Sequence, residues 1–178
     1  MRRISLLLAM GAALAVSACA GDRISYYQVD NYDSSHLGDS TKYGPIPVRV
    51  YGEPRAGSGE LATANAIAQA MAGANIGTPV EYVAAEQLPA DGYVMILQFG
   101  GGAAPGFLCR DGGEPGGVGG DYAAAFCLGE TNLSYAAGNV GDSDIASSGF
   151  RQAMSTAAVI MLPPENPNFS DCTINDCN

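Results

Sequence analysis

Apolar and polar residues follow regular spacings from residue 46 onward, and these spacings predict strands and helices. Ile46, Val48 and Val50 share one face of an expected strand over residues 46–51, because successive side chains of a strand point to opposite faces. Pro47 has no N–H, so we expect this strand at a sheet edge, or with Pro47 at its first turn.

Two segments carry apolar residues three and four positions apart, which is the period of an amphipathic helix. The first covers residues 60–72, with Ser58 as its expected cap and Gly73 to Gly77 ending it. The second covers residues 149–162, with Ser147 or Ser148 as its cap and Pro163-Pro164 as its end. Both apolar stripes are rich in alanine, which allows a helix to approach a sheet closely.

Four further strands are expected, over residues 79–85, 93–99, 122–128 and 132–136. The run from Tyr93 to Phe99 is nearly all apolar, which predicts a central strand covered on both faces. The last two form a hairpin around Gly129-Glu130, and residues 100–121 before them form a glycine-rich loop. The order is therefore strand, helix, four strands, helix. This order predicts an α+β two-layer sandwich, in which a mainly antiparallel sheet of about five strands is covered by two helices.

The amino end has a different pattern, typical of an export signal. A short basic start, Met1-Arg2-Arg3, precedes an uninterrupted stretch of low polarity from Ile4 to Val16, which leads into small residues and Cys19. This stretch is shorter than the roughly 20 residues of a membrane-spanning helix. We therefore expect it to direct export rather than to remain as an anchor.

Val16-Ser17-Ala18-Cys19 resembles the lipobox of bacterial lipoproteins. The resemblance implies that residues 1–18 are a signal peptide that is removed, that the Cys19 thiol receives a diacylglyceryl group, and that the new amine is acylated. Size, acidity and cysteine content are also similar to those of small envelope lipoproteins of Gram-negative bacteria. In that class Ala20 implies delivery to the outer membrane, on its periplasmic face. The alternatives are an ordinary secretory signal cut after Ala18 and twin-arginine export, although Ile4-Ser5-Leu6 lacks the rest of the twin-arginine pattern.

The polar stretch after Cys19 has no sustained period, so residues 19–45 are predicted to be a lipid-anchored tether, with Ser25–Val29 as one candidate short strand. The folded domain then covers residues 46–164, and residues 165–178 form a tail. Tyr26, Tyr27, Tyr32 and Tyr43 are candidates for a contact surface within the tether, because tyrosines are common at interfaces.

The charge of the chain excludes nucleic acids as partners. The net charge is −10, and removal of Arg2 and Arg3 with the signal would make it −12. Such a chain is repelled by DNA, RNA and anionic lipid surfaces. The acidity favours solubility, and it also fits a basic partner or a divalent cation.

Four cysteines remain once Cys19 is lipidated, and an even number in an exported chain predicts two disulfides. Three pairings are open. We expect Cys109–Cys127 and Cys172–Cys177, because each pair is the nearest in sequence. Zinc is the weaker alternative, since the four residues between Cys172 and Cys177 are the wide end of the usual ligand spacing. No Cys-x-x-Cys dithiol is present.

Other motifs with chemical meaning are incomplete. Gly116–Asp121 matches the start of a calcium-binding nonapeptide repeat, but a single copy is present and Ala123 stands where a large apolar residue belongs. Two Gly-Asp-Ser triplets, at 38–40 and 141–143, match the nucleophile block of GDS-type lipases and esterases. The chain's one histidine, His36, precedes both serines, whereas that family has its histidine late in the chain. Asp142 and Asp144 lack the glycine and distal glutamate of an EF-hand loop.

No residue is therefore predicted to be catalytic, to bind a cofactor or to ligate a metal, and no cofactor is expected. The leading hypothesis is a non-enzymatic envelope module. Its predicted partners are the lipid bilayer, through acylated Cys19, and an envelope protein. Two alternatives stay open: a hydrolase that acts on an envelope polymer or lipid, and a calcium-binding protein that uses residues 111–121.

Overall fold

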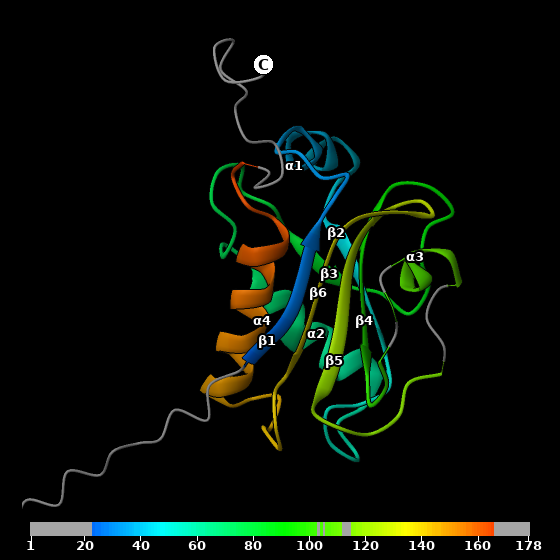
Figure 1. The fold of residues 1–178 in the computed structure, drawn as a ribbon, viewed down its shortest axis with the longest axis vertical. Helices are drawn as coiled ribbons and strands as arrows, with labels where there is room; N and C mark the ends of the chain where they lie inside the picture. Colours follow the sequence, from blue (N-terminus) through cyan, green and yellow to red (C-terminus); the bar gives the residue numbers. More distant parts are fainter. Residues whose placement is uncertain (1–22, 103, 105, 112–114, 166–178) are drawn as a thin grey trace, which may run out of the picture.

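The computed structural model describes residues 23–102, 104, 106–111 and 115–165 of the chain (Figure 1). The predicted signal and lipobox, including Cys19, and the predicted Cys172–Cys177 pair lie outside the described residues.

The fold is α+β, as the sequence predicts, and its sheet has six strands in the spatial order β1-β6-β5-β4-β2-β3 (Figure 1). The strands are β1 (Arg23–Val29), β2 (Ile46–Tyr51), β3 (Tyr82–Ala84), β4 (Tyr93–Phe99), β5 (Asp121–Leu128) and β6 (Thr131–Asn139). The helices are α1 (Ser35–Ser40), α2 (Glu60–Met71), α3 (Phe107–Asp111) and α4 (Ser148–Met161), with a 3₁₀ turn η1 at Thr41–Tyr43. Strand β2 runs parallel to β3 and β4, and the other neighbouring pairs are antiparallel.

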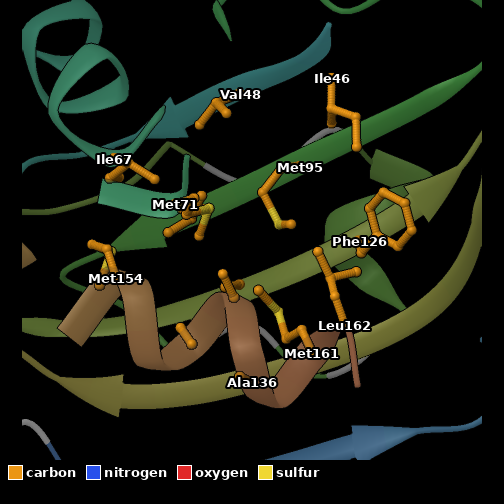
Figure 2. Close-up of a cluster of buried hydrophobic side chains, with 14 of the residues drawn as sticks. Ile46, Val48, Ile67, Met71, Met95, Phe126, Ala136, Met154, Met161 and Leu162 are labelled. Atoms are coloured by element: carbon orange, nitrogen blue, oxygen red, sulfur yellow. The ribbon is translucent and has the colours of Figure 1, made fainter. Parts of the chain in front are cut away.

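Helices α2 and α4 cover one face of the sheet, and the short helix α3 lies on the other (Figure 1). Strand β4 is buried along its whole length, as predicted for a central strand. Met95 and Leu97 enter the main core beneath α2 and α4, whereas Val94 and Ile96 enter a second, smaller core beneath α3. Figure 2 shows the main core, in which side chains of α2 and α4 meet those of β2, β4, β5 and β6.

The predicted tether over residues 19–45 is wrong from residue 23 onward. Arg23–Val29 forms edge strand β1, which pairs antiparallel with β6 in a register from Arg23 opposite Asn139 to Val29 opposite Ser134. Tyr32 is fully buried and Leu37 is 1% exposed, so the segment after β1 also packs into the main core. The folded domain therefore begins more than twenty residues earlier than the sequence pattern indicates.

Other details of the prediction also change. Strand β2 is internal rather than at an edge: Ile46 N–H and Val48 C=O bond toward β3, and the pairing with β4 begins only at Val48, beyond Pro47. Ser58 does not cap α2, because Gly59 takes the cap position without a side-chain bond. The Glu60 carboxylate instead accepts the Gly52 N–H at 2.9 Å. The predicted strand over residues 79–85 shortens to β3.

Three glycine-containing backbone segments meet at the ends of β2 and β4, at Gly52, Gly100 and Gly116-Gly117. We call this meeting point the glycine crossing. Gly117 donates its N–H to the Phe99 carbonyl at 2.9 Å, and its carbonyl accepts the Glu53 N–H at 2.9 Å. These backbone hydrogen bonds extend the sheet beyond the ends of β4 and β2. A Cβ on Gly116 would collide with the backbone of Tyr51 and Gly52, and one on Gly100 would collide with Gly117. Side chains have no room where three backbone segments meet this closely.

Gly116→Ala is expected to lower the free energy of unfolding by about 2 kcal/mol, because the added methyl must displace backbone rather than a flexible side chain. Urea unfolding followed by circular dichroism measures the change. Gly102→Ala is the matched control, since its new Cβ would meet nothing within 4 Å. Equal unfolding midpoints for the two variants would contradict the crossing.

Ser147→Ala is expected to lower the free energy of unfolding by about 1 kcal/mol. The Ser147 side chain caps α4 by accepting the Phe150 N–H at 3.1 Å, and alanine leaves that donor unpaired. Ser148→Ala, one residue inside the helix, is the control and should unfold like the natural chain. A larger loss from Ser148→Ala than from Ser147→Ala would contradict the assignment of Ser147 as the cap of α4.

Candidate functional site

The two faces of the sheet are covered unequally, and the less covered face carries the candidate site. Helix α3 contacts β4, β5 and β6 but has no comparable packing on β1. On the α3 side, two hollows lie along strands β1 and β6, at opposite ends of the pair. We call these two hollows, together with Tyr26, which packs against the lining residue Tyr135, the β1–β6 surface.

The first hollow, here called the glycine hollow, has a volume of about 320 Å³. Its wall includes the backbone of Gly100, Gly101 and Gly102, and its polar side chains include Ser25 and Asp121. Ser25 Oγ donates to the Ala137 carbonyl at 3.2 Å, and the Asp121 carboxylate accepts a hydrogen bond from Asn139. These contacts fix the polar groups on strand ends rather than on freely moving loops.

Gln98 lies directly behind the glycine wall. Its side chain is on the α3 face, since it is opposite Ala123, and a Cβ on Gly101 would lie 3.4 Å from Gln98 Nε2. Gln98 is 5% exposed, and its Oε1 has no hydrogen-bond partner among the described residues. Buried side-chain acceptors are normally paired, so this amide oxygen is an exception, although Gln98 is not among the residues that line the hollow.

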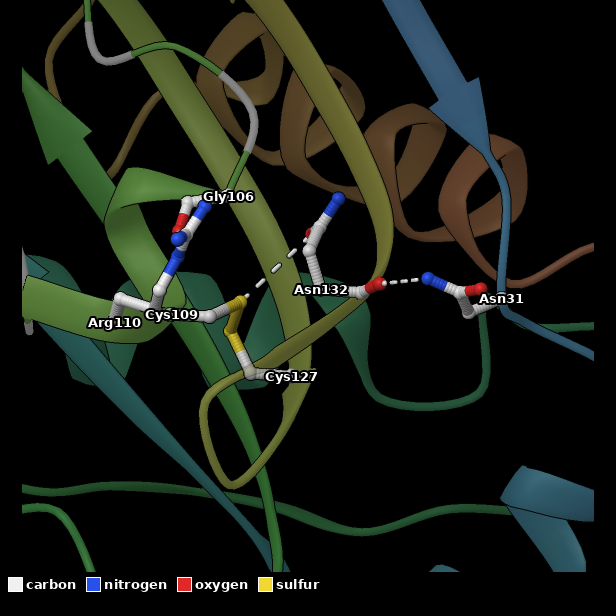
Figure 3. The surroundings of a disulfide bond; sticks show 6 residues. All are labelled: Asn31, Gly106, Cys109, Arg110, Cys127 and Asn132. Carbon is white, nitrogen blue, oxygen red and sulfur yellow. Dashed lines mark hydrogen bonds between the residues drawn. A yellow bond between two sulfur atoms is a disulfide. The ribbon is translucent and has the colours of Figure 1, made fainter.

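The second hollow, here called the disulfide hollow, also has a volume of about 320 Å³. Its lining comes from the end of β1, from α3 and from the β5–β6 hairpin: Gln28, Asp30, Asn31, Arg110, Glu130 and Asn132. Figure 3 shows Asn31 Nδ2 donating to the Asn132 carbonyl, at 3.0 Å, which ties the end of β1 to β6. The lining is almost entirely amide and charged.

The Cys109–Cys127 disulfide positions one wall of this hollow (Figure 3). The pairing is the one expected from sequence, and it joins α3 to β5 with the two Cα atoms 5.7 Å apart. Cys109 Sγ also lies 3.8 Å from Asn132 Oδ1, a contact rather than a hydrogen bond because a disulfide sulfur carries no hydrogen. Arg110, the next residue of α3, is thereby placed beside the hairpin.

Tyr135 lines the glycine hollow, and Tyr26 packs against it with ring centroids 5.9 Å apart. Tyr26 is 49% exposed and donates its hydroxyl proton to Gln28 Oε1 at 2.9 Å. Burial, and secondarily the neighbouring Tyr26, raises the pKa of Tyr135, so its hydroxyl stays protonated in the neutral range. The pair offers an aromatic surface flanked by polar groups.

The charges on the β1–β6 surface have no ionic partners within the described ranges. The salt bridges among the described residues join Lys42 to Asp39 and Arg49 to Glu60, and neither pair belongs to the β1–β6 surface. Asp30 and Glu130 line the disulfide hollow together with Arg110, and no salt bridge among the described residues joins them. The surface favours neutral polar or cationic groups and disfavours anions.

The candidate hydrolase residues do not come together around a serine. Ser40 is buried, and its hydroxyl donates to the Leu37 carbonyl at 2.8 Å. The ring of His36 contacts Tyr93 Oη through Nδ1, at 3.0 Å, and the Asn31 carbonyl through Nε2, at 3.1 Å. The second triplet lies in a turn, where Ser143 N–H donates to the Val140 carbonyl at 3.3 Å. In the described structure His36 joins α1 to β4.

The candidate calcium residues are also separated. Gly116 and Gly117 take part in the glycine crossing, Asp121 starts β5 beside Asn139, and Asp144 Oδ1 accepts the Ala146 N–H at 2.8 Å. Within the described ranges, no three His, Cys, Asp or Glu side chains gather closely enough to hold a metal ion.

The four tyrosines predicted as one contact surface do not form one. Tyr32 is buried in the main core, where burial and the nearby Asp33 raise its pKa to about 12. Tyr26 and Tyr27 lie on opposite faces of the sheet, because Tyr26 is opposite Ala137 and Tyr27 is opposite Ala136. The sequence pattern does not predict the β1–β6 surface, because it places residues 19–45 in a tether, although the candidate strand at Ser25–Val29 is a signal for it.

No helix in the part of the chain that the structure describes has both the length and the apolar character needed to cross a membrane. No protein-family model, curated protein or solved structure matches the chain.

Replacement of both Cys109 and Cys127 by alanine is expected to lower the free energy of unfolding by about 3 kcal/mol, from the 18-residue separation that the bridge closes. Reduction of the natural chain by dithiothreitol should give a similar loss in urea unfolding. An additional effect of dithiothreitol on the double variant should be small by comparison. If the double variant were as stable as the natural chain, the disulfide would not contribute to the packing of α3.

Proposed function

We propose that the chain is a lipid-anchored envelope protein, and that its folded domain is a non-enzymatic binding module that uses the β1–β6 surface. The lipobox at Val16–Cys19 supports the anchor, and with Ala20 it supports a place on the periplasmic face of the outer membrane. The proposed partners are the bilayer, through acylated Cys19, and an envelope component at the β1–β6 surface.

The observation that carries the binding role is the β1–β6 surface itself. Two hollows of about 320 Å³ each lie beside an accessible tyrosine, and they are lined by polar groups that hydrogen bonds within the protein hold in place. A concave surface with an aromatic ring and several convergent polar groups is the usual form of a ligand site. Its charges and amides are held by strand ends, a disulfide and a hairpin, so the surface is arranged before a ligand arrives.

The anchor would place this surface close to the membrane. β1 begins at Arg23, four residues after Cys19. An extended chain over that separation spans at most about 14 Å, so the domain would rest near the bilayer instead of hanging from a long tether. Its negative charge keeps it from lying flat on anionic headgroups. The module would therefore bind components at or next to the membrane surface.

The anchor is tested by the intact mass of the mature protein extracted from membranes. The expected mass corresponds to a chain that begins at Cys19 and carries two or three acyl chains, and Cys19→Ala should move the protein out of the membrane fraction. A mature chain without acyl groups, or one that keeps residues 1–18, would contradict the anchor.

The binding surface is tested by a photo-crosslinking amino acid placed at Gln28, in the disulfide hollow, or at Tyr27, on the opposite face of the same strand. Irradiation of intact cells is expected to give reproducible products of higher mass from position 28 and few or none from position 27. Absence of products from position 28, or equal products from both positions, would contradict a binding role for this surface.

A further inference from the structure

We infer that the β1–β6 surface binds a saccharide chain that is neutral or carries amino groups. This inference rests on the proposed binding role and names the chemical class of the ligand. Four features of the surface support it: an exposed aromatic ring, a polar lining, the length of the surface and its charge.

The aromatic feature is Tyr26. About half of its surface is exposed, and it packs at an angle against Tyr135 while its hydroxyl is held by Gln28. The flat face of such a ring buries apolar area at low entropic cost while the hydroxyl stays hydrogen-bonded. The C–H face of a pyranose ring is a suitable partner, because it is flat, weakly apolar and edged by hydroxyls.

The polar lining fits hydroxyl groups better than it fits peptide side chains. The disulfide hollow holds the amides of Gln28, Asn31 and Asn132. Hydrogen bonds to Tyr26, Asp30 and the Asn132 carbonyl orient the first two, and an amide group keeps further donor and acceptor capacity beyond one bond at each end. Sugar hydroxyls also donate and accept, so neighbouring hydroxyls match such amides. A peptide would be held by apolar pockets for its side chains, and this lining supplies none.

The spacing of the two hollows indicates a chain rather than a single ring. Ser25 lines the glycine hollow and Asp30 lines the disulfide hollow. Ser25 and Gln28, which are the nearest lining residues on β1, are three residue steps or about 10 Å apart, and Ser25 to Asp30 is five steps or about 17 Å. One sugar ring fills only one hollow, whereas several linked rings would reach both and cross Tyr26 between them.

The charge of the surface selects among saccharides. In the disulfide hollow the carboxylates of Asp30 and Glu130 outnumber the guanidinium of Arg110, and none of the three forms an ion pair among the described residues. Uronic acids and phosphorylated sugars are therefore repelled, and amino groups are attracted. Neutral chains are tolerated because amides, rather than charges, supply most of the hydrogen bonds.

The test uses the mature protein in a detergent without a sugar headgroup, titrated calorimetrically with three tetrasaccharides. The probes are neutral β-1,4-linked N-acetylglucosamine, its cationic de-N-acetylated form and anionic galacturonic acid. The expected order of affinity is cationic, then neutral, with no binding of the anionic probe. Replacing Asp30 and Glu130 by Asn and Gln should remove the preference for the cationic probe over the neutral one.

Tyr26→Ala and Tyr27→Ala form the matched pair, because these neighbours are 49% and 54% exposed on opposite faces of β1. Tyr26→Ala is expected to weaken binding of the neutral probe about tenfold, the loss of one stacked aromatic contact. Tyr27→Ala should leave its affinity within about twofold, a difference too small to reflect a lost contact.

Equal loss in the two variants, or preferred binding of the anionic probe, would overturn the saccharide inference. Failure of all three probes would do the same. If position 28 still gave cross-linked products in cells, the binding role would stand and only the ligand class would be wrong. If position 28 gave none, the binding role would fail independently.

Discussion

The burial of β4 on both faces is the constraint on which the rest of the structure depends. A strand whose side chains are apolar on both sides needs a covering layer on each side of the sheet. Helices α2 and α4 supply the first layer over Met95 and Leu97. The second layer, over Val94 and Ile96, is small because α3 has only five residues, and a disulfide fastens it to β5. Both cores therefore depend on one strand near the middle of the sheet.

The unequal layers explain where the candidate site lies. A five-residue helix cannot cover a six-stranded sheet, so the face beside β1 and β6 stays accessible while α4 covers the same strands on the other side. The hairpin, the end of β1 and α3 meet around the disulfide hollow, and the glycine crossing shapes the other hollow. The features that stabilise the second layer are thus the ones that form the β1–β6 surface.

The glycine-rich segment shows how one composition can serve several structures. A run of glycines fits a flexible loop and also the start of a calcium-binding repeat. Here Gly52, Gly100, Gly116 and Gly117 allow three backbone segments to approach more closely than any side chain would permit. The hydrogen bonds of Gly117 to Phe99 and Glu53 then extend the sheet beyond the ends of β2 and β4. Close approach, rather than mobility, is what these glycines provide.

The sequence by itself determined the elements whose period is local and complete: the buried strand at Tyr93–Phe99, helices α2 and α4 and the β5–β6 hairpin. It also determined the Cys109–Cys127 pairing. The candidate strand at Ser25–Val29 is confirmed as part of β1, but only the tertiary structure decided that it belongs to the sheet rather than to a tether, because its partner β6 lies about a hundred residues further along the chain. The same pairing separates Tyr26 from Tyr27 and brings Gln28 and Asn132 to one hollow. Local spacing shows which residues share a face within one element. The register between distant strands depends instead on which pairing buries the apolar side chains of the whole core.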